Sequence, residues 1–178
     1  MTPEHARLMA GHNLVQNQRM YAAAARLDPA VVVADQGAYF GSILGTLNHI
    51  AVGDTIWMHR FAQHGARFDA LQALAQFPQP SSLRQPLAED LLGLQGYRQA
   101  LDSILLRWAE ELEPAHMDVL LSYASVAGAA AKRRFGDLLL HFFNHQTHHR
   151  GQVSTLLFQN GVDVGVTDVL PLIPSVQD

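Results

Sequence analysis

Hydrophobic residues recur along this chain at steps of three and four, which is the period of an amphipathic helix. Four long segments carry helical character: residues 3–27, 42 to about 65, 87–112 and about 136–160. The connections between them are of moderate length. Because each long segment needs a partner for its apolar side, the pattern predicts an all-α protein built as a four-helix bundle.

The ends of these segments carry residues that start or stop helices. Ser42 is a good N-cap, because its hydroxyl can accept a hydrogen bond from a first-turn N–H. Pro29 and Pro114 end the first and third segments, since a helix rarely continues through the residue before a proline. Gly161 follows the last segment and suits the left-handed position after a helix.

Residues 117–134 do not follow the helical period. Val119, Leu121 and Tyr123 alternate with other residues, as in a strand, and Gly128 is a candidate for a turn. We interpret the segment as a small β-hairpin before the last long helix. A helix is the alternative, because the segment is rich in alanine.

Shorter segments join these elements. Residues 68–77 are predicted as a short helix, 30–40 as a connection and 162–178 as an irregular tail. The loop at residues 78–82, rich in proline and serine, is the nearest approach to a linker. Five residues do not make a domain boundary, so we expect one domain over residues 1–178.

The amino-acid composition excludes several classes of function. The 178 residues include no cysteine, which excludes disulfides, thiol catalysis by the chain and metal sites with Cys ligands. Charged residues make up 16% and the net charge is -4, which argues against nucleic-acid binding and leaves room for a subunit interface. The start lacks a signal-peptide pattern, and the longest uncharged stretch, residues 36–53, holds polar residues and glycines. We expect a cytoplasmic protein that binds no membrane.

Histidines are concentrated in the last helix. His145 and His149 lie one turn apart on its inward stripe, and His141 and His148 lie on the flank of that stripe. Side chains at i and i+4 stand over one another, so both imidazoles can direct nitrogens at one metal ion. Two ligands rarely suffice, and bundle sites draw ligands from facing helices. His49, on the second helix, is the best candidate for a third.

Two other interpretations compete with a metal site. Histidines in a core or on a surface can satisfy their nitrogens by hydrogen bonds alone. The segment also resembles the His-Glu-x-x-His motif of metalloproteases, but Gln146 stands where the glutamate base would be. An amide cannot take up a proton in that role, so the metalloprotease class is excluded. His59 and His64 are expected in packing, surface or outer positions.

The motifs resemble those of a known family. The last helix reads Asn-His-x-x-x-His-Arg-Gly-Gln over residues 144–152, and the second reads Asn-His at 48–49, followed by Asp54 and Trp57. This combination resembles the DinB family of DNA-damage-inducible proteins, which is unrelated to the DNA polymerase that shares the name. The resemblance covers nearly the whole chain, including Gly128 before the last helix.

The resemblance implies a metal centre and a partner. Members are four-helix bundles, commonly homodimers, that hold a divalent metal with three histidines, which implies His49, His145 and His149 as ligands here, with zinc or nickel as the ion. Three nitrogen ligands leave a position open for water or substrate. Relatives in the wider superfamily resemble thiol-dependent transferases and isomerases, and a metal-bound water can ionise near neutral pH and attack an electrophile. We therefore expect a thiol-dependent transferase or a hydrolase that acts on a small molecule, in the first case with a low-molecular-weight thiol. The alternative is a non-catalytic, stress-related metal-binding protein or a dimerisation module.

Residues around the histidines can support such a site. Asn144 and Gln152 could orient the ligand imidazoles by accepting their second N–H. Arg150, which only donates, could bind an acidic substrate or make helix and tail contacts. His141 and His148 are further candidates for these surrounding positions.

Charged residues interrupt two of the apolar stripes. Asp54 and Arg98 each stand alone among hydrophobic positions, and an ion pair between them would explain both. The alternative is that both reach solvent. The basic run at residues 132–134 is predicted to be a solvated end of the hairpin.

Overall fold

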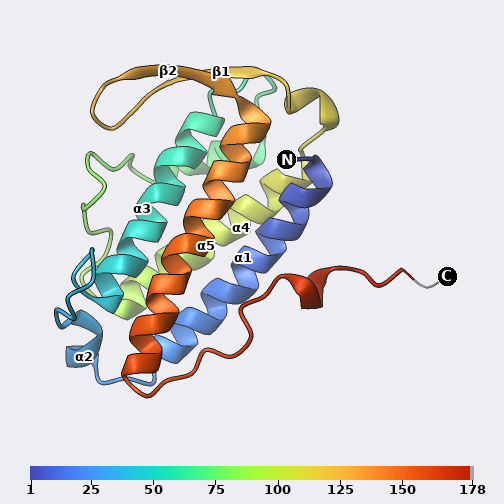
Figure 1. The fold of residues 1–178 in the computed structure, drawn as a ribbon. Coiled ribbons are helices and arrows are strands. Elements are labelled where there is room, and N and C mark those ends of the chain that lie inside the picture. Colours follow the sequence, from blue (N-terminus) through green and yellow to red (C-terminus); the bar gives the residue numbers. More distant parts are fainter. Residues whose placement is uncertain (177–178) are drawn as a thin grey trace.

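Four long helices form the bundle that the sequence predicts. The computed structural model describes residues 1–176 (Figure 1). The long helices are α1 (Pro3–Ala24), α3 (Ile43–Phe61), α4 (Leu91–Glu110) and α5 (Phe135–Gln159). Helix α1 packs most closely against α4, and α3 against α5, while α1–α5 and α3–α4 contacts close the bundle. The predicted four-helix bundle is confirmed.

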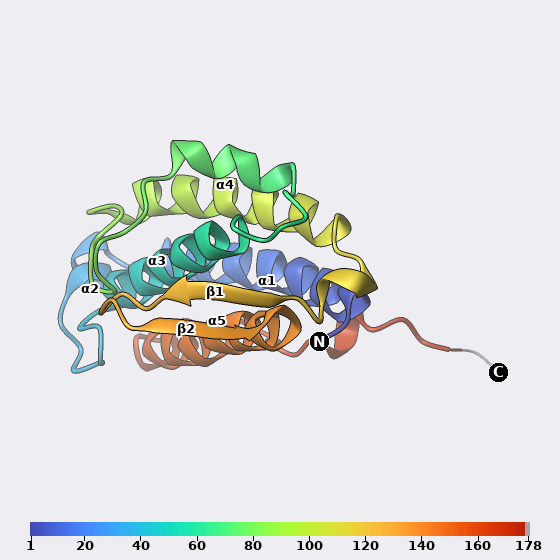
Figure 2. The same ribbon diagram turned by 90° about the horizontal axis from the view of Figure 1, so that it is seen from above.

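The predicted hairpin before the last helix is also confirmed. Strands β1 (Leu120–Ala124) and β2 (Ala130–Arg134) pair antiparallel, with Leu120 opposite Arg134. Gly128 lies in the connecting turn with a φ of +83°, a conformation that favours glycine. Figures 1 and 2 show the hairpin lying across one end of α3 and α5. The basic run at residues 132–134 lies in β2 itself and not at the hairpin tip.

Shorter helices occupy the connections. They are α2 (Pro29–Val33) and three 3₁₀ helices: η1 (Ala70–Gln76), η2 (Pro114–His116) and η3 (Leu170–Leu172). Among the described residues, no helix combines the length and apolar character needed to cross a bilayer.

Side-chain caps explain why some helices begin at residues other than the predicted ones. The third long helix begins at Leu91 instead of residue 87, because the Asp90 carboxylate accepts a hydrogen bond of 2.7 Å from the backbone N–H of Gly93. The first helix ends at Ala24, and Asp28 caps α2 inside the predicted connection through the N–H of Ala30, at 2.8 Å. Ser42 caps α3 as predicted.

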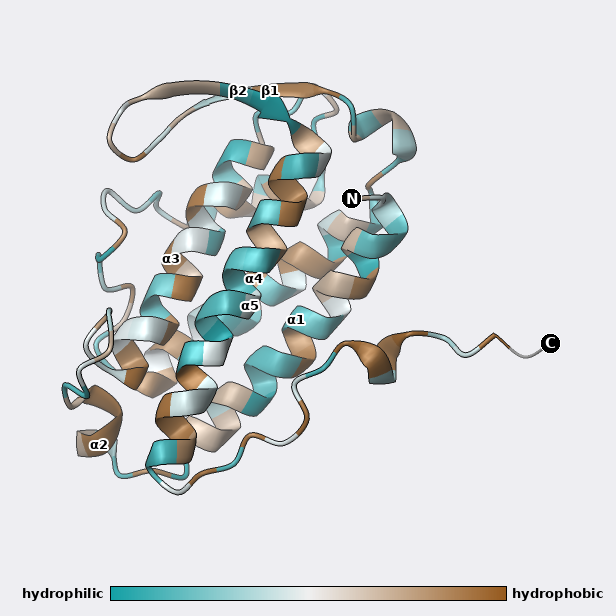
Figure 3. Cartoon of the chain, viewed as in Figure 1, coloured by the Kyte–Doolittle hydropathy of each residue, from teal (hydrophilic) through white to brown (hydrophobic). Residues whose placement is uncertain are grey.

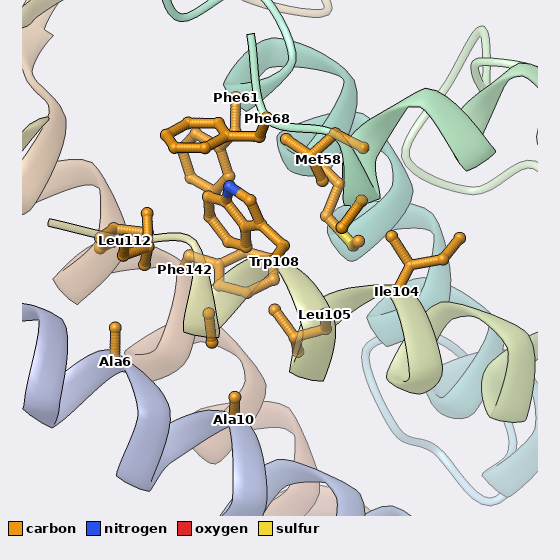
Figure 4. Close-up of a cluster of buried hydrophobic side chains, with 14 of the residues drawn as sticks. Ala6, Ala10, Met58, Phe61, Phe68, Ile104, Leu105, Trp108, Leu112 and Phe142 are labelled. Atoms are coloured by element: carbon orange, nitrogen blue, oxygen red, sulfur yellow. The ribbon is translucent and has the colours of Figure 1, made fainter. Parts of the chain in front are cut away.

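Two hydrophobic clusters fill the bundle. At the hairpin end, Trp108 stacks on Phe61 with ring centroids 5.1 Å apart, and both lie in the cluster that Figure 4 shows. The other cluster, near α2 and the start of α3, includes Met20 and Leu47. Figure 3 shows that the middle of α5 is hydrophilic between the two hydrophobic ends of that helix.

A buried layer of charged and polar side chains lies among the helices. Arg98 of α4 pairs with Asp54 of α3 at 2.5 Å and with Asp102 of its own helix at 2.9 Å. Asn13 and Asn17 of α1 donate hydrogen bonds to the Asp102 carboxylate at 3.0–3.1 Å. The predicted Asp54–Arg98 ion pair therefore exists, and it belongs to a network that joins three helices.

Acidification is expected to destabilise the bundle through His64. Its Nδ1 accepts a hydrogen bond of 3.0 Å from the N–H of Ala66, and burial lowers its pKa below the ordinary 6.5. Near pH 6.5 and below, His64 therefore binds a proton more readily in the unfolded chain than in the folded one. The free energy of unfolding falls as the pH drops through about 6.5. One such proton changes the free energy of unfolding by up to about 1.4 kcal/mol per pH unit.

Urea denaturation of chelator-treated protein between pH 5 and pH 8 measures this effect. His64→Gln keeps an acceptor for the Ala66 N–H but does not titrate, so its stability should depend less steeply on pH. Equal slopes for the two proteins would contradict the prediction.

Candidate metal centre

Three histidines from two helices converge beside the α3–α5 contact. Nε2 of His49, on α3, lies 3.1 Å from Nε2 of His145 and 3.2 Å from Nε2 of His149, both on α5. Nitrogens that surround a tetrahedral ion at bond lengths of about 2.0–2.1 Å are roughly 3.3 Å apart. These two spacings match those between nitrogens in a tetrahedral coordination shell, and one ligand nitrogen from each of the three histidines lies within 4.8 Å of the other two. The sequence prediction brought together the same three residues.

The other ring nitrogens fix how two of the imidazoles face the cluster. Nδ1 of His49 donates to the carbonyl oxygen of Leu83 at 3.0 Å, and Nδ1 of His149 donates to Oε1 of Gln152 at 2.7 Å. A neutral imidazole carries one N–H, so the Nε2 atoms of these two rings present lone pairs to each other. Facing lone pairs repel, and a cation between them removes the repulsion. The donor set therefore fits a divalent metal ion.

Burial keeps these histidines neutral, which is the form that binds a metal. His49 and His149 are buried and His145 is half-buried. Burial lowers the pKa of all three, and with the neighbouring histidines it lowers the pKa of His145 to about 3. The cluster is therefore uncharged at neutral pH.

A glycine makes room for one of the imidazoles. Gly53 lies one turn after His49 on α3, and a Cβ atom at this position would come within 2.8 Å of Cε1 of His145. That is shorter than a van der Waals contact, so α3 can approach the His145 ring this closely only because residue 53 has no side chain.

Gly53→Ala is expected to displace the His145 imidazole and weaken metal binding by about 10–100-fold, as for the loss of a group that orients a ligand. The control is Gly96→Ala on α4, where a Cβ atom meets open space and the change should only favour the helix, by roughly 0.5–1 kcal/mol. Competition with a chromophoric chelator measures both affinities. A Gly53→Ala protein with unchanged affinity would rule out this role for the glycine.

Comparison with known proteins agrees with this geometry. A family model described as the DinB family matches residues 1–175. The chain belongs to the DinB family. A search of curated proteins and a search of solved structures each found no match. Family membership and the three clustered histidines together fit a metal-binding DinB protein.

The other predicted residues of this DinB protein lie in different surroundings. Gln152 contacts His149 as described, and its amide nitrogen is 3.5 Å from Nε2 of the exposed His148. His141 is exposed, with its ring centroid 6.2 Å from that of His145. Asn144 is exposed, and within residues 1–176 its side chain makes no hydrogen bond to the three histidines.

Arg150 turns away from the histidines of the DinB motif. It is buried on the α1 side of α5, where Nη1 donates to Oδ1 of Asn13 and Nη2 donates to Oγ1 of Thr147 at 3.3 Å. Burial lowers its pKa to about 10, so the guanidinium stays charged at neutral pH. Arg150 therefore makes the helix contacts that were the alternative to binding an acidic substrate.

Loop residues that the sequence did not single out enclose one side of the DinB cluster. The Phe40 ring stacks on His49 with centroids 3.7 Å apart and meets His149 edge-on at 5.5 Å. Arg84 lies over Phe40 at 5.1 Å and over Tyr39 at 4.8 Å. Both loops lack a periodic pattern, so no sequence signal pointed to these contacts.

Proposed function

We propose that this DinB-family protein is a metal-dependent enzyme, a thiol-dependent transferase or a hydrolase, with zinc or nickel held by His49, His145 and His149. The observation that carries the proposal is the convergence of the three Nε2 atoms while the Nδ1 atoms of His49 and His149 are bonded elsewhere. A divalent ion there would supply a Lewis acid that lowers the pKa of a thiol or a water molecule.

The surroundings favour access from one direction. Phe40 covers His49 and His149, whereas His145 is half-buried and stays open to solvent. An open depression of about 520 Å³ is lined in part by Tyr39, His148 and Gln152, and Gln152 links it to His149, although none of the three clustered histidines lines it. Gln152 thus bonds His149 on one side and borders this depression on the other.

The absence of a carboxylate from the cluster, within residues 1–176, favours thiol transfer over hydrolysis. Within residues 1–176, no carboxylate joins the three histidines. Asp54, the acid nearest to His49 along α3, is occupied by Arg98 in the buried layer. Hydrolysis usually uses a positioned base to move protons, whereas a thiol needs only to lose its own proton to become a nucleophile.

Cobalt substitution tests the proposal. We expect protein loaded with one equivalent of Co²⁺ to show a visible spectrum typical of four-coordinate cobalt, and a low-molecular-weight thiol such as cysteine to change that spectrum by binding to the open position. The same protein loaded with zinc or nickel should speed the conjugation of the thiol to an electrophile such as 1-chloro-2,4-dinitrobenzene. The His149→Ala protein should show neither the thiol-dependent change in the cobalt spectrum nor the conjugation activity.

Other outcomes identify the alternatives. A spectrum that no thiol changes, together with a large loss of stability on chelation, would replace the enzyme by a non-catalytic metal-binding protein. Hydrolysis of p-nitrophenyl esters without thiol transfer would favour the hydrolase. The homodimer expected from the resemblance stays a prediction, and sedimentation of the purified protein measures it.

A further inference from the structure

A second, smaller cavity lies on the opposite side of α5 from the histidines. Its volume is about 170 Å³, and we call it the α1–α5–tail pocket. Its walls come from α1, α5 and the tail, and include His12, Gln16, Arg150, Ser154 and Thr167. In Figure 1 the tail leaves the end of α5 and runs back beside α1. It is held there by hydrogen bonds from α1.

Two buried acceptors in this pocket have no partner within the described residues. Nε2 of His12 donates to the carbonyl oxygen of Thr167 at 3.0 Å, which leaves Nδ1 of the same ring as a bare acceptor. Nε2 of Gln16 donates to the carbonyl oxygen of Val166 at 3.3 Å, which leaves Oε1 free. His12 is 4% exposed and Gln16 2% exposed. An unpaired acceptor this deeply buried costs free energy unless something donates to it.

The pocket is also lined by a buried cation to which no carboxylate of residues 1–176 is bonded. Arg150 is 4% exposed and takes part in none of the ion pairs found in residues 1–176, since Asp54 and Asp102 both pair with Arg98. Its two hydrogen bonds go to neutral oxygens, on Asn13 and Thr147, and a guanidinium has five N–H donors. Spare donors beside a buried positive charge bind a carboxylate well.

We propose that the α1–α5–tail pocket binds a small carboxylate that also carries a hydrogen-bond donor, such as a 2-hydroxy acid. The carboxylate accepts hydrogen bonds from Arg150, and the hydroxyl donates to His12 and Gln16. The acceptors and the cation lie on different walls, α1 and α5, so a ligand that joins both must have both groups. The site is separate from the metal centre and does not depend on the proposed enzymatic function.

Titrations of the full chain with three probes test this pairing of groups. Glycolate has a carboxylate and a hydroxyl, acetate has only the carboxylate, and ethylene glycol has only hydroxyls. We expect glycolate to shift the backbone amide resonances of Gly151, Ser154 and Thr167 with a dissociation constant of about 1 mM. Acetate and ethylene glycol should bind at least about tenfold more weakly, since each loses one set of hydrogen bonds.

Two variants locate the binding without disturbing Arg150. Ser154→Leu fills the pocket and His12→Phe removes the bare Nδ1, so each should weaken glycolate binding by about tenfold or more. Ser103→Leu, an exposed serine on α4, is the matched control and should bind as the original protein does.

Chelator-treated protein should bind glycolate equally well. Binding that disappears on chelation would place the ligand on the three histidines and overturn the proposal. Saturable shifts with the same dissociation constant in the Ser154→Leu and His12→Phe proteins would also overturn the proposal. So would the absence of any shift up to roughly 50 mM glycolate, which would mean that water alone satisfies the pocket.

Discussion

Replacing His145 with alanine is expected to remove the bound metal ion from the purified protein. Nε2 of His145 lies 3.1 Å from Nε2 of His49, and its loss leaves two imidazoles to hold the ion. Deleting a ligand costs more than the roughly 10–100-fold loss that follows from deleting an orienting group, so the ion should be lost during purification. Elemental analysis of untagged protein should give about one equivalent of metal in the original chain and almost none in the variant.

His148→Ala is the matched control for this experiment. His148 is exposed and lies on α5 between the two histidines of the cluster, but its ring faces the surface and contacts Gln152. The His148→Ala protein should keep its full equivalent of metal. If His145→Ala and the original chain carried the same amount of metal, the three-histidine site would be wrong.

Replacing Arg98 with methionine is expected to lower the free energy of unfolding by about 3–5 kcal/mol, the usual cost of breaking a buried ion pair from one side. Arg98 is 2% exposed and pairs with both Asp54 and Asp102. Without it, two carboxylates would share a buried layer with no bonded cation. Methionine keeps an unbranched apolar chain in place of the aliphatic part of arginine, so most of the loss in the free energy of unfolding reports the missing charge and its hydrogen bonds.

Arg7→Met provides the comparison for Arg98→Met. Arg7 pairs with Glu110 at 3.4 Å on the surface of the same α1–α4 contact, and Glu110 is 73% exposed. Exposed pairs contribute roughly 0–1 kcal/mol, so this variant should unfold close to the original protein. Urea denaturation of chelator-treated protein measures both variants. If Arg98→Met lowered the free energy of unfolding by less than about 1 kcal/mol, Arg98 would not stabilise the buried layer as predicted.

The sequence predicted the long elements of the fold because their signals are local. The helical period of the hydrophobic residues predicted the four-helix bundle. Ser42 and Gly161 marked helix ends that the structure confirms. The start of α4 was misplaced, because Leu87 fits the apolar stripe although the cap is Asp90. Helix α2 was missed inside a predicted connection, since five residues are too few to show a period.

The candidate site was predictable where residues of one helix share a face. His145 and His149 are a turn apart in sequence and in space. His49 was the candidate for a third ligand from a facing helix, and the family resemblance supported it. The rotation of α5 was not predictable from the stripe, because the helix is buried on two sides. Arg150 was expected to flank the ligands and instead faces α1. Phe40 was missed because only tertiary packing brings its loop onto His49.

The positions of the three histidines along the chain have a further consequence. His49 and His145 are 96 positions apart, so an ion held between them would cross-link α3 and α5 as a disulfide would, in a chain that has no cysteine. Closing a loop of about 100 residues is worth about 4–5 kcal/mol in the chain-entropy description. Unlike a disulfide, this link would open whenever the ion leaves. Above the dissociation constant, each tenfold rise in the free metal concentration would then add about 1.4 kcal/mol to the free energy of unfolding. The fraction of folded protein would therefore depend on the supply of metal.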